Sequence, residues 1–357
     1  MTTSMDAVVC HGPGDYRFER IAVPALPAGG AVLRVESVGI CASDVKCFQG
    51  APMFWGDESR AAYCEPPVVS GHEFIGIVEE IDAAAVSRWG VDVGSRVAVE
   101  QIVPCGTCLY CRRGSFWLCD PHRIFGFKTS LPGAMGQYVA IPSAAHVYQM
   151  AADVRPAHAA FTEPLACALH AVDRAGLLAE DVVVVAGAGP IGLGMVAGAA
   201  RSGVRTIIAV DANDKRLEVA SRAGAHLTIN ITTDDPVARL AELTDGYGCD
   251  VYFEATGHPS AVPQGLQMLR KQGRFVEYSV FKEPVSADWT IIGDSKELTV
   301  LGAHLGPHRW PTAIDMIERG QLPLDQIVTH ELPLTDYAHG LSLVAAGTES
   351  IKVVLVP

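Results

Sequence analysis

The segment VVVVAGAGPIG, residues 182–192, places four consecutive valines directly before three closely spaced glycines. An unbroken run of β-branched residues is typical of a buried strand, and the G-x-G-x-x-G spacing is typical of a turn that leads from a strand into a helix. The first glycine permits the tight turn, the second lets the backbone approach a pyrophosphate, and the third lets the helix pack against the strand. We therefore predict a dinucleotide-binding turn formed by Gly187, Gly189, Pro190, Ile191 and Gly192.

An acidic residue follows the next expected strand, residues 206–210. Asp211 comes nineteen residues after Gly192. An acid at this place hydrogen-bonds the ribose hydroxyls of NAD and repels the 2′-phosphate of NADP. The sequence therefore predicts NAD as the cofactor, with Asp211 and Arg216 as further cofactor-binding candidates, although the cations Lys215 and Arg216 weaken the expected rejection of NADP. A glycine-rich turn followed by a helix-capping aspartate is the alternative interpretation.

The expected strands and helices divide the chain into two regions. Residues 1 to about 150 contain short apolar runs separated by Gly, Pro and Asp turns, which is typical of a β-rich region. From about 155 to 300, strands alternate with helices, which predicts a mainly parallel sheet covered by helices on both faces. The strands expected in the first region are 31–38, 75–81, 96–99 and 137–141. Those expected in the second are 182–186, 206–210, 226–230, 250–255, 274–279 and 298–301, with helices at 214–223 and 259–270, and the tail has a helix at 311–318 and a strand at 351–356.

The composition excludes several classes of partner. The 357 residues carry a formal net charge of −13, so neither nucleic acid nor an anionic membrane is an expected partner, and two domains are the natural expectation for this length. Residues 182–200 contain no charged residue, but their glycines and proline favour a strand, a turn and a helix over a membrane span. The first six residues have neither the basic start nor the apolar run of a secretory signal, which favours a cytoplasmic protein.

Four of the ten cysteines lie within fifteen residues, at Cys105, Cys108, Cys111 and Cys119. Four thiolates on one loop can close a tetrahedron around Zn²⁺ and leave no position open for chemistry, so the spacing predicts a structural zinc site. The energy of metal binding at such a site contributes to folding. Five other cysteines are expected to be ordinary buried or half-buried thiols: Cys10, Cys47, Cys64, Cys167 and Cys249.

A second set of potential zinc ligands is scattered along the chain. It consists of Cys41, the Gly71-His72-Glu73 tripeptide and Glu163 before Pro164. One thiolate, one imidazole and a carboxylate would leave a zinc position open for water or substrate, as catalytic sites do. Taken singly, a buried cysteine is usually packing, Gly-His-Glu is often a turn, and Glu before Pro often starts a helix. Their joint presence with the dinucleotide turn favours a catalytic metal site.

These motifs together resemble the zinc-containing medium-chain dehydrogenase/reductase family, from about residue 5 to the C-terminus. The resemblance implies an α/β protein of two domains. Residues 1–155 and 303–357 would form a GroES-like, β-rich catalytic domain that binds zinc, and residues 156–302 an NAD-binding Rossmann domain with a doubly wound parallel sheet. The family places its active site in the cleft between the two domains.

Glu163 makes the chain similar to the polyol, or sorbitol-type, branch, because the classical alcohol branch has a cysteine at the matching position. The resemblance implies that Cys41 and His72 bind the catalytic zinc, and that Glu73 and Glu163 compete for the third protein position. It also implies that Ser43 relays the proton of the reacting hydroxyl. Lys46 stands where the family often has a histidine that passes this proton to solvent.

Two segments depart from the sorbitol-type pattern. Leu305-Gly306 replace an Arg-Tyr pair that grips the substrate hydroxyls, and the nearby candidates to replace it are His304, His308 and Arg309. The segment between Cys41 and His72 is longer than in sorbitol dehydrogenases, and its extra residues include Phe54, Trp55 and Tyr63. We expect this insert to form a lid that narrows the pocket.

The expected activity is oxidation of a secondary hydroxyl of a small polyol, such as a four-carbon sugar alcohol, to a ketose with NAD as the oxidant. A dehydrogenase of the same scaffold that acts on threonine, butanediol or simple alcohols is the nearest alternative. A non-catalytic protein that binds NAD and zinc is the alternative from another class. The family also suggests a homodimer or a homotetramer, with residues 291–292 and 298–301 as a candidate edge for subunit pairing.

Overall fold

A computed structural model describes residues 3–357 and divides the chain into two compact units. The first unit runs from the amino terminus to Glu163 and also contains Trp310–Arg319 and Val328–Pro357. The second unit consists of Pro164–Arg309 and Gly320–Ile327. The carboxyl-terminal segment therefore returns to the unit that the amino-terminal residues build.

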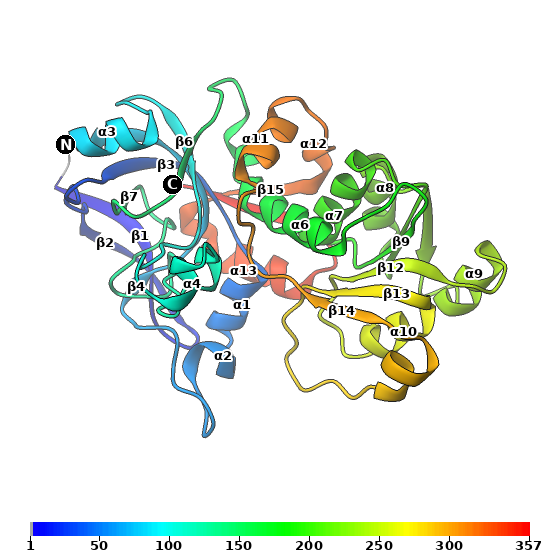
Figure 1. The fold of residues 1–357 in the computed structure, drawn as a ribbon. Helices are drawn as coiled ribbons and strands as arrows, with labels where there is room; N and C mark the ends of the chain where they lie inside the picture. Colours follow the sequence, from blue (N-terminus) through cyan, green and yellow to red (C-terminus); the bar gives the residue numbers. More distant parts are fainter. Residues whose placement is uncertain (1–2) are drawn as a thin grey trace. The chain divides into compact units, whose positions relative to one another are not determined.

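The second unit is built on a six-stranded parallel sheet with the order β11-β10-β9-β12-β13-β14. The central strand β9 is the buried valine run, and helices α7 and α10 lie on opposite sides of the sheet (Figure 1). This order changes direction beside β9, which is the place where doubly wound sheets bind their ligands. The strands are β9 (Val182–Ala186), β10 (Thr206–Asp211), β11 (Leu227–Asn230), β12 (Cys249–Glu254), β13 (Leu269–Glu277) and β14 (Thr299–Gly302). The helices are α6 (Thr162–Ala175, which begins in the first unit), α7 (Pro190–Arg201), α8 (Asp214–Ala223), α9 (Pro236–Leu243), α10 (Ala261–Met268), the π-helix η2 (Ile291–Ser295) and α12 (Leu324–Ile327).

The first unit contains two sheets that are mostly antiparallel. One has the order β15-β16-β3-β5-β6-β8, with β7 also paired to β3, and the other has the order β2-β1-β4. The last strand of the chain, β16, pairs with β3, so that residues more than 300 positions apart in sequence become neighbours. The strands are β1 (Ser4–Gly12), β2 (Asp15–Ala22), β3 (Ala31–Gly39), β4 (Val68–Val69), β5 (Glu73–Ile81), β6 (Arg96–Val99), β7 (Tyr138–Ile141), β8 (Val147–Gln149), β15 (Val328–Pro333) and β16 (Lys352–Val356).

Short helices connect the strands of the first unit. Three of them position candidate site residues, because α1 begins directly after Cys41, α4 contains Cys111, and η1 ends directly before Cys119. Asp82 caps α3, accepting a hydrogen bond of 2.8 Å from the amide of Ala84. The helices are α1 (Ala42–Phe48), α2 (Pro52–Trp55), α3 (Ala83–Trp89), α4 (Leu109–Arg112), η1 (Phe116–Leu118), α5 (Pro156–Ala159), α11 (Trp310–Glu318), η3 (Leu334–Asp336) and α13 (Tyr337–Ala346).

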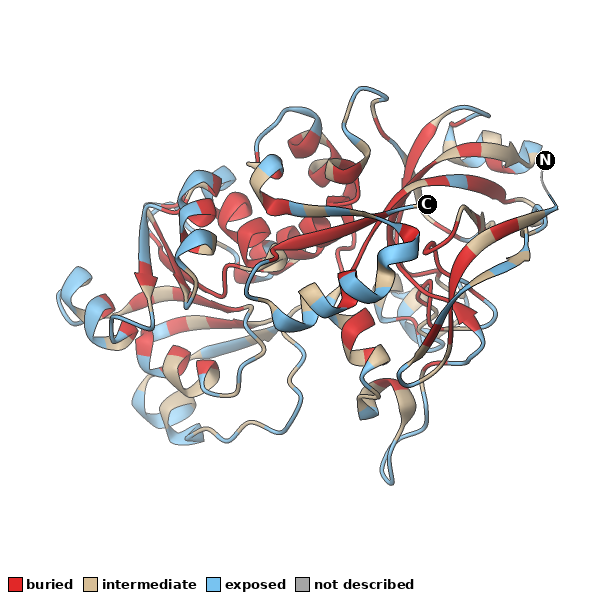
Figure 2. Cartoon of the chain, turned by 180° about the vertical axis from the view of Figure 1, so that it is seen from behind, coloured by how far each residue is buried: buried red, intermediate tan, exposed pale blue. Residues whose placement is uncertain are grey.

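Buried residues concentrate on the strands and on the helix faces that contact them, as the view from behind shows (Figure 2). The alternation of strand and helix predicted from the sequence is confirmed, and element ends differ by a few residues only. No helix within residues 3–357 is long and apolar enough to cross a membrane. The uncharged stretch 182–200 instead forms β9, the glycine turn and most of α7, as the glycines predicted.

Candidate functional site

The four clustered cysteines converge in space. The sulfur atoms of Cys105, Cys108, Cys111 and Cys119 all lie within 4.8 Å of one another, and those of Cys105 and Cys111 are 4.0 Å apart. Helix α4 and η1 bring them together, since Cys108 caps α4, Cys111 lies within it and Cys119 follows η1. Backbone amides point at the sulfurs, with N···S distances of 3.2 Å from Cys105 to Cys119 and 3.3 Å from Cys108 to Cys105.

Those amides stabilise thiolates, which are the form that binds metal. Hydrogen bonds from the side chain and backbone of Thr107 lower the pKa of Cys105 to about 6. The four sulfur atoms are close enough together to bind one metal ion tetrahedrally. A set of four thiolates without a carboxylate or imidazole is typical of a closed Zn²⁺ site. The residues present therefore fit a structural zinc ion.

A second metal-binding group combines Cys41, His72 and Glu73, whose ligand atoms lie within 4.8 Å of one another. Cys41 precedes α1, and Glu73 is the first residue of β5, directly after His72. His72 and Glu73 are 5% and 2% exposed, so these polar groups are buried without a shell of water. A thiolate, an imidazole and a carboxylate fit a zinc ion that keeps an open position.

Asp44 orients two members of this group. It is 1% exposed, its Oδ2 accepts a hydrogen bond of 2.9 Å from the amide of Cys41, and its Oδ1 lies 3.5 Å from Nδ1 of His72. A carboxylate behind a metal-binding histidine fixes the orientation of the ring and leaves the other nitrogen for the metal. Asp44 is therefore a positioning residue for Cys41 and His72.

Lys352 of β16 forms a buried ion pair with Glu73. Both side chains are almost completely buried, and the Lys352 ammonium also donates a hydrogen bond of 3.0 Å to the carbonyl of Ile40. Burial by itself would lower the pKa of Lys352, but the charges of Glu73 and Cys41 outweigh it and keep the lysine protonated. Gly39 makes room for the pair, because a Cβ there would lie 2.2 Å from Oε2 of Glu73.

Glu163 lies at the start of α6 and is 6% exposed. Its Oε1 accepts a hydrogen bond from the side-chain amide of Gln101, which is fully buried. Among the described residues, the group within mutual metal-binding reach includes Glu73 and omits Glu163. Glu163 nevertheless lies near enough to raise the pKa of Lys352 by its charge. The two glutamates therefore occupy distinct positions, one in the ligand group and one beside it.

The insert between Cys41 and His72 is anchored through its aromatic side chains. Phe54 is 3% exposed and stacks on Phe127 with ring centroids 5.1 Å apart, and Phe127 lies 5.5 Å from the ring of His72. The Tyr63 hydroxyl donates a hydrogen bond of 2.7 Å to the carbonyl of His122. The tip, residues 57–62, is exposed throughout, and so are residues 65–67. The aromatic part of the insert is thus a packed wall near His72, and the narrowing of the pocket by this insert stays a prediction.

The glycine turn has the geometry that its sequence predicts. Gly187 has a φ of +94°, and a Cβ on Gly192 would lie 1.7 Å from the Gly187 carbonyl oxygen, so neither position tolerates a side chain. Helix α7 begins at Pro190 and leaves its first amides without intrahelical partners, which favours a phosphate there. Gly194 lets α7 approach α6, since a Cβ there would lie 2.6 Å from that of Ala168.

Asp211 ends β10 beside this turn. One carboxylate oxygen accepts a hydrogen bond of 2.7 Å from the amide of Ala188, and the other accepts one of 2.9 Å from the amide of Asn213. Each oxygen can accept a further bond, so the carboxylate is held in place and remains able to bind ribose hydroxyls. The guanidinium of Arg216 also reaches the turn, 3.9 Å from the place of a Cβ on Gly189.

The segment that replaces the Arg-Tyr pair packs on α6. A Cβ on Gly306 would lie 2.5 Å from the backbone of Ala166, so the chain approaches the helix too closely for a larger residue. Arg309 forms an ion pair with Asp173 of the same helix. This ion pair holds the Arg309 guanidinium against α6.

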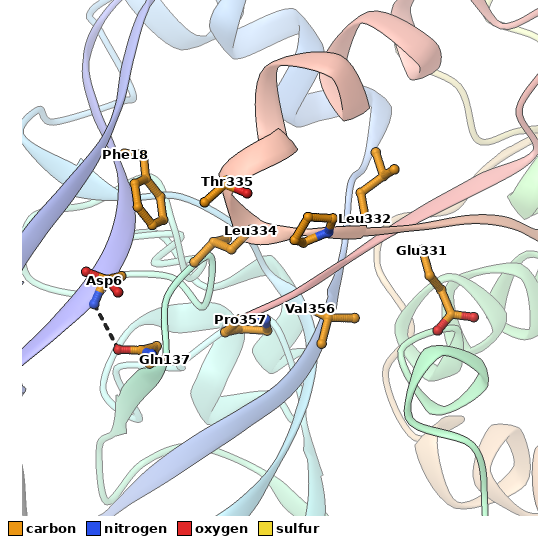
Figure 3. A pocket seen from close by; sticks show the side chains of 10 residues that line it. Asp6, Phe18, Gln137, Glu331, Leu332, Leu334, Thr335, Val356 and Pro357 are labelled. Atoms are coloured by element: carbon orange, nitrogen blue, oxygen red, sulfur yellow. Dashed lines mark hydrogen bonds between the residues drawn. The ribbon is translucent and has the colours of Figure 1, made fainter.

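A surface pocket of about 470 Å³ lies elsewhere on the first unit, where Phe18, Leu332 and Leu334 provide apolar side chains and Asp6 and Glu331 acidic ones (Figure 3). None of the residues that line it belongs to either group of metal ligands. We therefore assign the chemistry to the Cys41, His72 and Glu73 group and not to this pocket.

Two family models match the chain. The model described as "Alcohol dehydrogenase GroES-like domain" matches residues 27–152, and the model described as "Zinc-binding dehydrogenase" matches residues 190–319. An erythritol/L-threitol dehydrogenase of Mycolicibacterium smegmatis is 57% identical over 99% of this chain and 98% of its own. The chain belongs to the family of zinc-binding medium-chain dehydrogenases.

Other proteins similar to this chain are named for different activities. An L-threonine 3-dehydrogenase of Bacillus velezensis is 35% identical over 95% of this chain and 94% of its own. An alcohol dehydrogenase structure from Escherichia coli CFT073 with NADH has a TM-score of 0.86 and 26% identity, and covers 100% of both chains. A zinc-binding dehydrogenase from Sinorhizobium meliloti 1021 with NADP has a TM-score of 0.90 and 29% identity at the same coverage.

The family and the fold class predicted from the sequence are thereby confirmed. Three residues near the metal ligands were not predicted, namely Asp44, Gln101 and Lys352. Lys352 carried a signal, because it is the one charged residue in the apolar final strand from Ile351 to Val356. Gln101 carried none, since only the fold brings it to Glu163.

Proposed function

We propose that the protein oxidises a secondary hydroxyl of a four-carbon sugar alcohol, such as erythritol or L-threitol, to a ketose with NAD as the oxidant. The observation that carries the proposal is the group of half-buried Cys41 and buried His72 and Glu73, a donor set suited to an open zinc site. The substrate class rests on the 57% identity to the erythritol/L-threitol dehydrogenase over nearly the whole chain.

In this proposal Cys41, His72 and Glu73 hold the catalytic zinc, and Cys105, Cys108, Cys111 and Cys119 hold the structural one. A bound zinc ion supplies Lewis acidity, which lowers the pKa of a hydroxyl that it contacts and makes proton loss possible near neutral pH. One carboxylate oxygen of Glu73 accepts a hydrogen bond from the Lys352 ammonium, and the other is available to a metal ion. We therefore assign the third ligand position to Glu73 and not to Glu163.

Glu163 then acts from beside the ligand group. Gln101 holds its carboxylate in one orientation through a neutral amide, which leaves the negative charge in place to accept a hydrogen bond from a substrate hydroxyl. Ser43, near the start of α1, takes the proton of the reacting hydroxyl, and Lys46, one turn further along α1, passes it to solvent. Glu163, Ser43 and Lys46 are accordingly the catalytic candidates besides the ligands.

NAD binding is assigned to the second unit, at Gly187, Gly189, Pro190, Ile191 and Gly192. Bound NAD supplies the acceptor for the hydride that leaves the carbinol carbon. Asp211 favours NAD over NADP because its fixed carboxylate would repel a 2′-phosphate, while Arg216 beside Gly189 attracts the pyrophosphate. The first unit is then the catalytic domain and the second the NAD-binding domain.

Strand β14 supports a homo-oligomer. It ends the strand order of the six-stranded sheet, and Val300 on it is 50% exposed. An unpaired edge with exposed apolar residues can pair with a second copy of the same strand. We therefore propose a homodimer, or a homotetramer built from it, that pairs along β14.

An activity screen tests the substrate. Initial rates of NAD reduction are measured for the zinc-loaded enzyme with erythritol, L-threitol, D-threitol, 2,3-butanediol, L-threonine and ethanol. We expect the highest kcat/KM with a tetritol. A higher kcat/KM with L-threonine or butanediol would assign the enzyme to the alternative of the same scaffold, which the 35% identity to an L-threonine 3-dehydrogenase supports. No turnover with any of them, with zinc bound, would favour a non-catalytic protein.

A further inference from the structure

Gln101 is a fully buried amide at the end of the strand pair that carries two of the metal ligands. Strands β5 and β6 pair antiparallel, with Ile75 opposite Ala98. His72 directly precedes β5, and Gln101 is the second residue after β6. Continued by these residues, the register sets Gln101 opposite His72. The strand next to β5 therefore brings Gln101 to the level of the candidate metal ligands.

The side chain of Gln101 connects this end of the sheet to Glu163. Its amide nitrogen donates a hydrogen bond to Oε1 of Glu163, 62 positions away in sequence. The Glu163 carboxylate therefore lies one hydrogen-bonded side chain away from the level of His72, although the group within mutual ligand reach omits it. A carboxylate oxygen is a zinc ligand in many proteins, so Glu163 is a natural competitor for a metal ion bound beside it.

Hydrogen bonds to neighbouring segments fix the backbone on which Gln101 stands. Its carbonyl accepts a hydrogen bond of 3.0 Å from the amide of Phe125. The preceding residue, Glu100, is fully buried and accepts hydrogen bonds of 2.9 Å from Nδ1 of His146 and 3.3 Å from the Tyr148 hydroxyl. The amide of Glu100 also donates a hydrogen bond of 2.9 Å to the His146 carbonyl. The Gln101 amide is thus a fixed donor.

We propose that Gln101 is a positioning residue, which keeps the Glu163 carboxylate out of the coordination sphere of the catalytic metal. This inference rests on the proposed function, because it takes Cys41, His72 and Glu73 as the zinc ligands. A fourth protein ligand would occupy the position that a catalytic zinc ion keeps for water or substrate. By holding Glu163 aside, Gln101 leaves this position open.

The charge of the site favours a neutral donor for this restraint. The Cys41 thiolate and the Glu73 carboxylate together balance the two positive charges of a zinc ion. A second carboxylate ligand would make the complex negative and so weaken the Lewis acidity on which the chemistry depends. The Gln101 amide restrains Glu163 without cancelling its charge, and the carboxylate stays able to accept a hydrogen bond from a substrate hydroxyl.

Cobalt substitution tests the inference by a readout other than turnover. The protein is loaded with Co²⁺ in place of zinc, its metal content is measured, and its d–d absorption is recorded during titration with imidazole. In the parent, imidazole enters the open position and shifts the spectrum. The four-cysteine group contributes equally to parent and variants, so difference spectra report the catalytic group alone.

Gln101→Met is the decisive variant, because it keeps the length of the side chain and removes the donor. Glu163 is then free to bind the metal, so the d–d spectrum should differ from that of the parent before imidazole is added. Imidazole must displace the carboxylate, and we expect its half-saturating concentration to rise by about tenfold or more. If Gln101→Met does not fold, Gln101→Asn replaces it, because asparagine keeps the amide and shortens its reach.

Two further variants identify the entering ligand. Gln101→Met/Glu163→Gln removes the competing carboxylate, so its imidazole titration should return toward that of the parent. Gln137→Met is the matched control and should titrate like the parent. Gln137 accepts a hydrogen bond of 3.0 Å from the amide of Asp6 and lines the surface pocket, not a metal group.

The inference is overturned if Gln101→Met binds imidazole as readily as the parent does. It is also overturned if the double variant keeps the weak imidazole response of Gln101→Met, because Glu163 is then not the entering ligand. Failure of the proposed function has a different signature. In that case the parent itself takes up only the cobalt of the four-cysteine group and does not respond to imidazole, which overturns both.

Discussion

Lys352 and Glu73 form an ion pair at the point where the last strand of the chain meets the candidate metal ligands. Both side chains are almost completely buried. Because the pair also involves Gly39 and the Ile40 carbonyl, it joins β16, β3 and β5 around one buried charge. The carboxyl-terminal strand is therefore part of the site and not only a cover for the sheet.

Removing the lysine should destabilise the first unit. Lys352→Met leaves the Glu73 carboxylate buried without a counter-charge, which costs about 3–5 kcal/mol in comparable pairs. For a domain of this size each kcal/mol lowers the melting temperature by about 2–4 °C, so we expect a decrease of about 6–20 °C by differential scanning calorimetry. Lys352→Arg keeps the charge and should lose less.

The double variant Lys352→Met/Glu73→Gln is the control for the charge. It removes the unpaired carboxylate, so its melting temperature should lie above that of Lys352→Met alone. If the two variants melt together, the loss in Lys352→Met comes from packing and the ion pair has no separate effect.

Substitutions in the two groups of metal ligands should have different effects on stability and activity. Cys111→Ser breaks the four-cysteine group, so we expect loss of one zinc per chain and a lower melting temperature before activity declines at low temperature. Cys41→Ser should abolish turnover, lose the other zinc and leave the far-ultraviolet circular dichroism unchanged. Zinc content by plasma emission, melting temperature and kcat are measured for both. Equal stability losses with full activity in both variants would contradict the division into structural and catalytic groups.

Much of this architecture could be predicted from local sequence. The valine run, the glycine turn and Asp211 lie within thirty residues, so spacing alone predicted β9, the turn, α7 and β10. The four-cysteine metal site could also be predicted from sequence spacing, because its ligands share one loop. Both are cases in which the physical constraint acts between residues that are close in the chain.

The remaining features depend on contacts between distant segments. Lys352 reaches Glu73 only because β16 pairs with β3, and Gln101 reaches Glu163, 62 positions away in sequence, only through the fold of the first unit. No periodicity or spacing encodes such contacts, so the sequence could not predict them.

Asp211 should control the choice of cofactor. Asp211→Ser removes the carboxylate that would repel a 2′-phosphate and keeps a small polar side chain. We expect the ratio of kcat/KM for NAD to that for NADP to fall by at least tenfold, about 1.4 kcal/mol. Steady-state rates with both cofactors at a saturating tetritol concentration give the ratio. Asp214→Ser, on the first turn of α8, is the matched control and should leave the ratio unchanged.

Glu277 should make stability depend on pH below neutrality. It pairs in register with Glu254 at the carboxyl ends of β13 and β12, and burial, followed by the charge of Glu254, raises its pKa to about 7. Between the ordinary glutamate pKa and about 7 the folded protein therefore binds a proton that the unfolded chain releases. Stability from this group is present at low pH and is lost as the pH rises through about 7. Glu277→Gln keeps the shape of the side chain and removes its titration. The melting temperature at pH 5 minus that at pH 8 should therefore be more positive in the parent than in this variant. If the melting temperatures of the two proteins change with pH in the same way, Glu277 has the same pKa in the folded and unfolded states and the prediction is wrong.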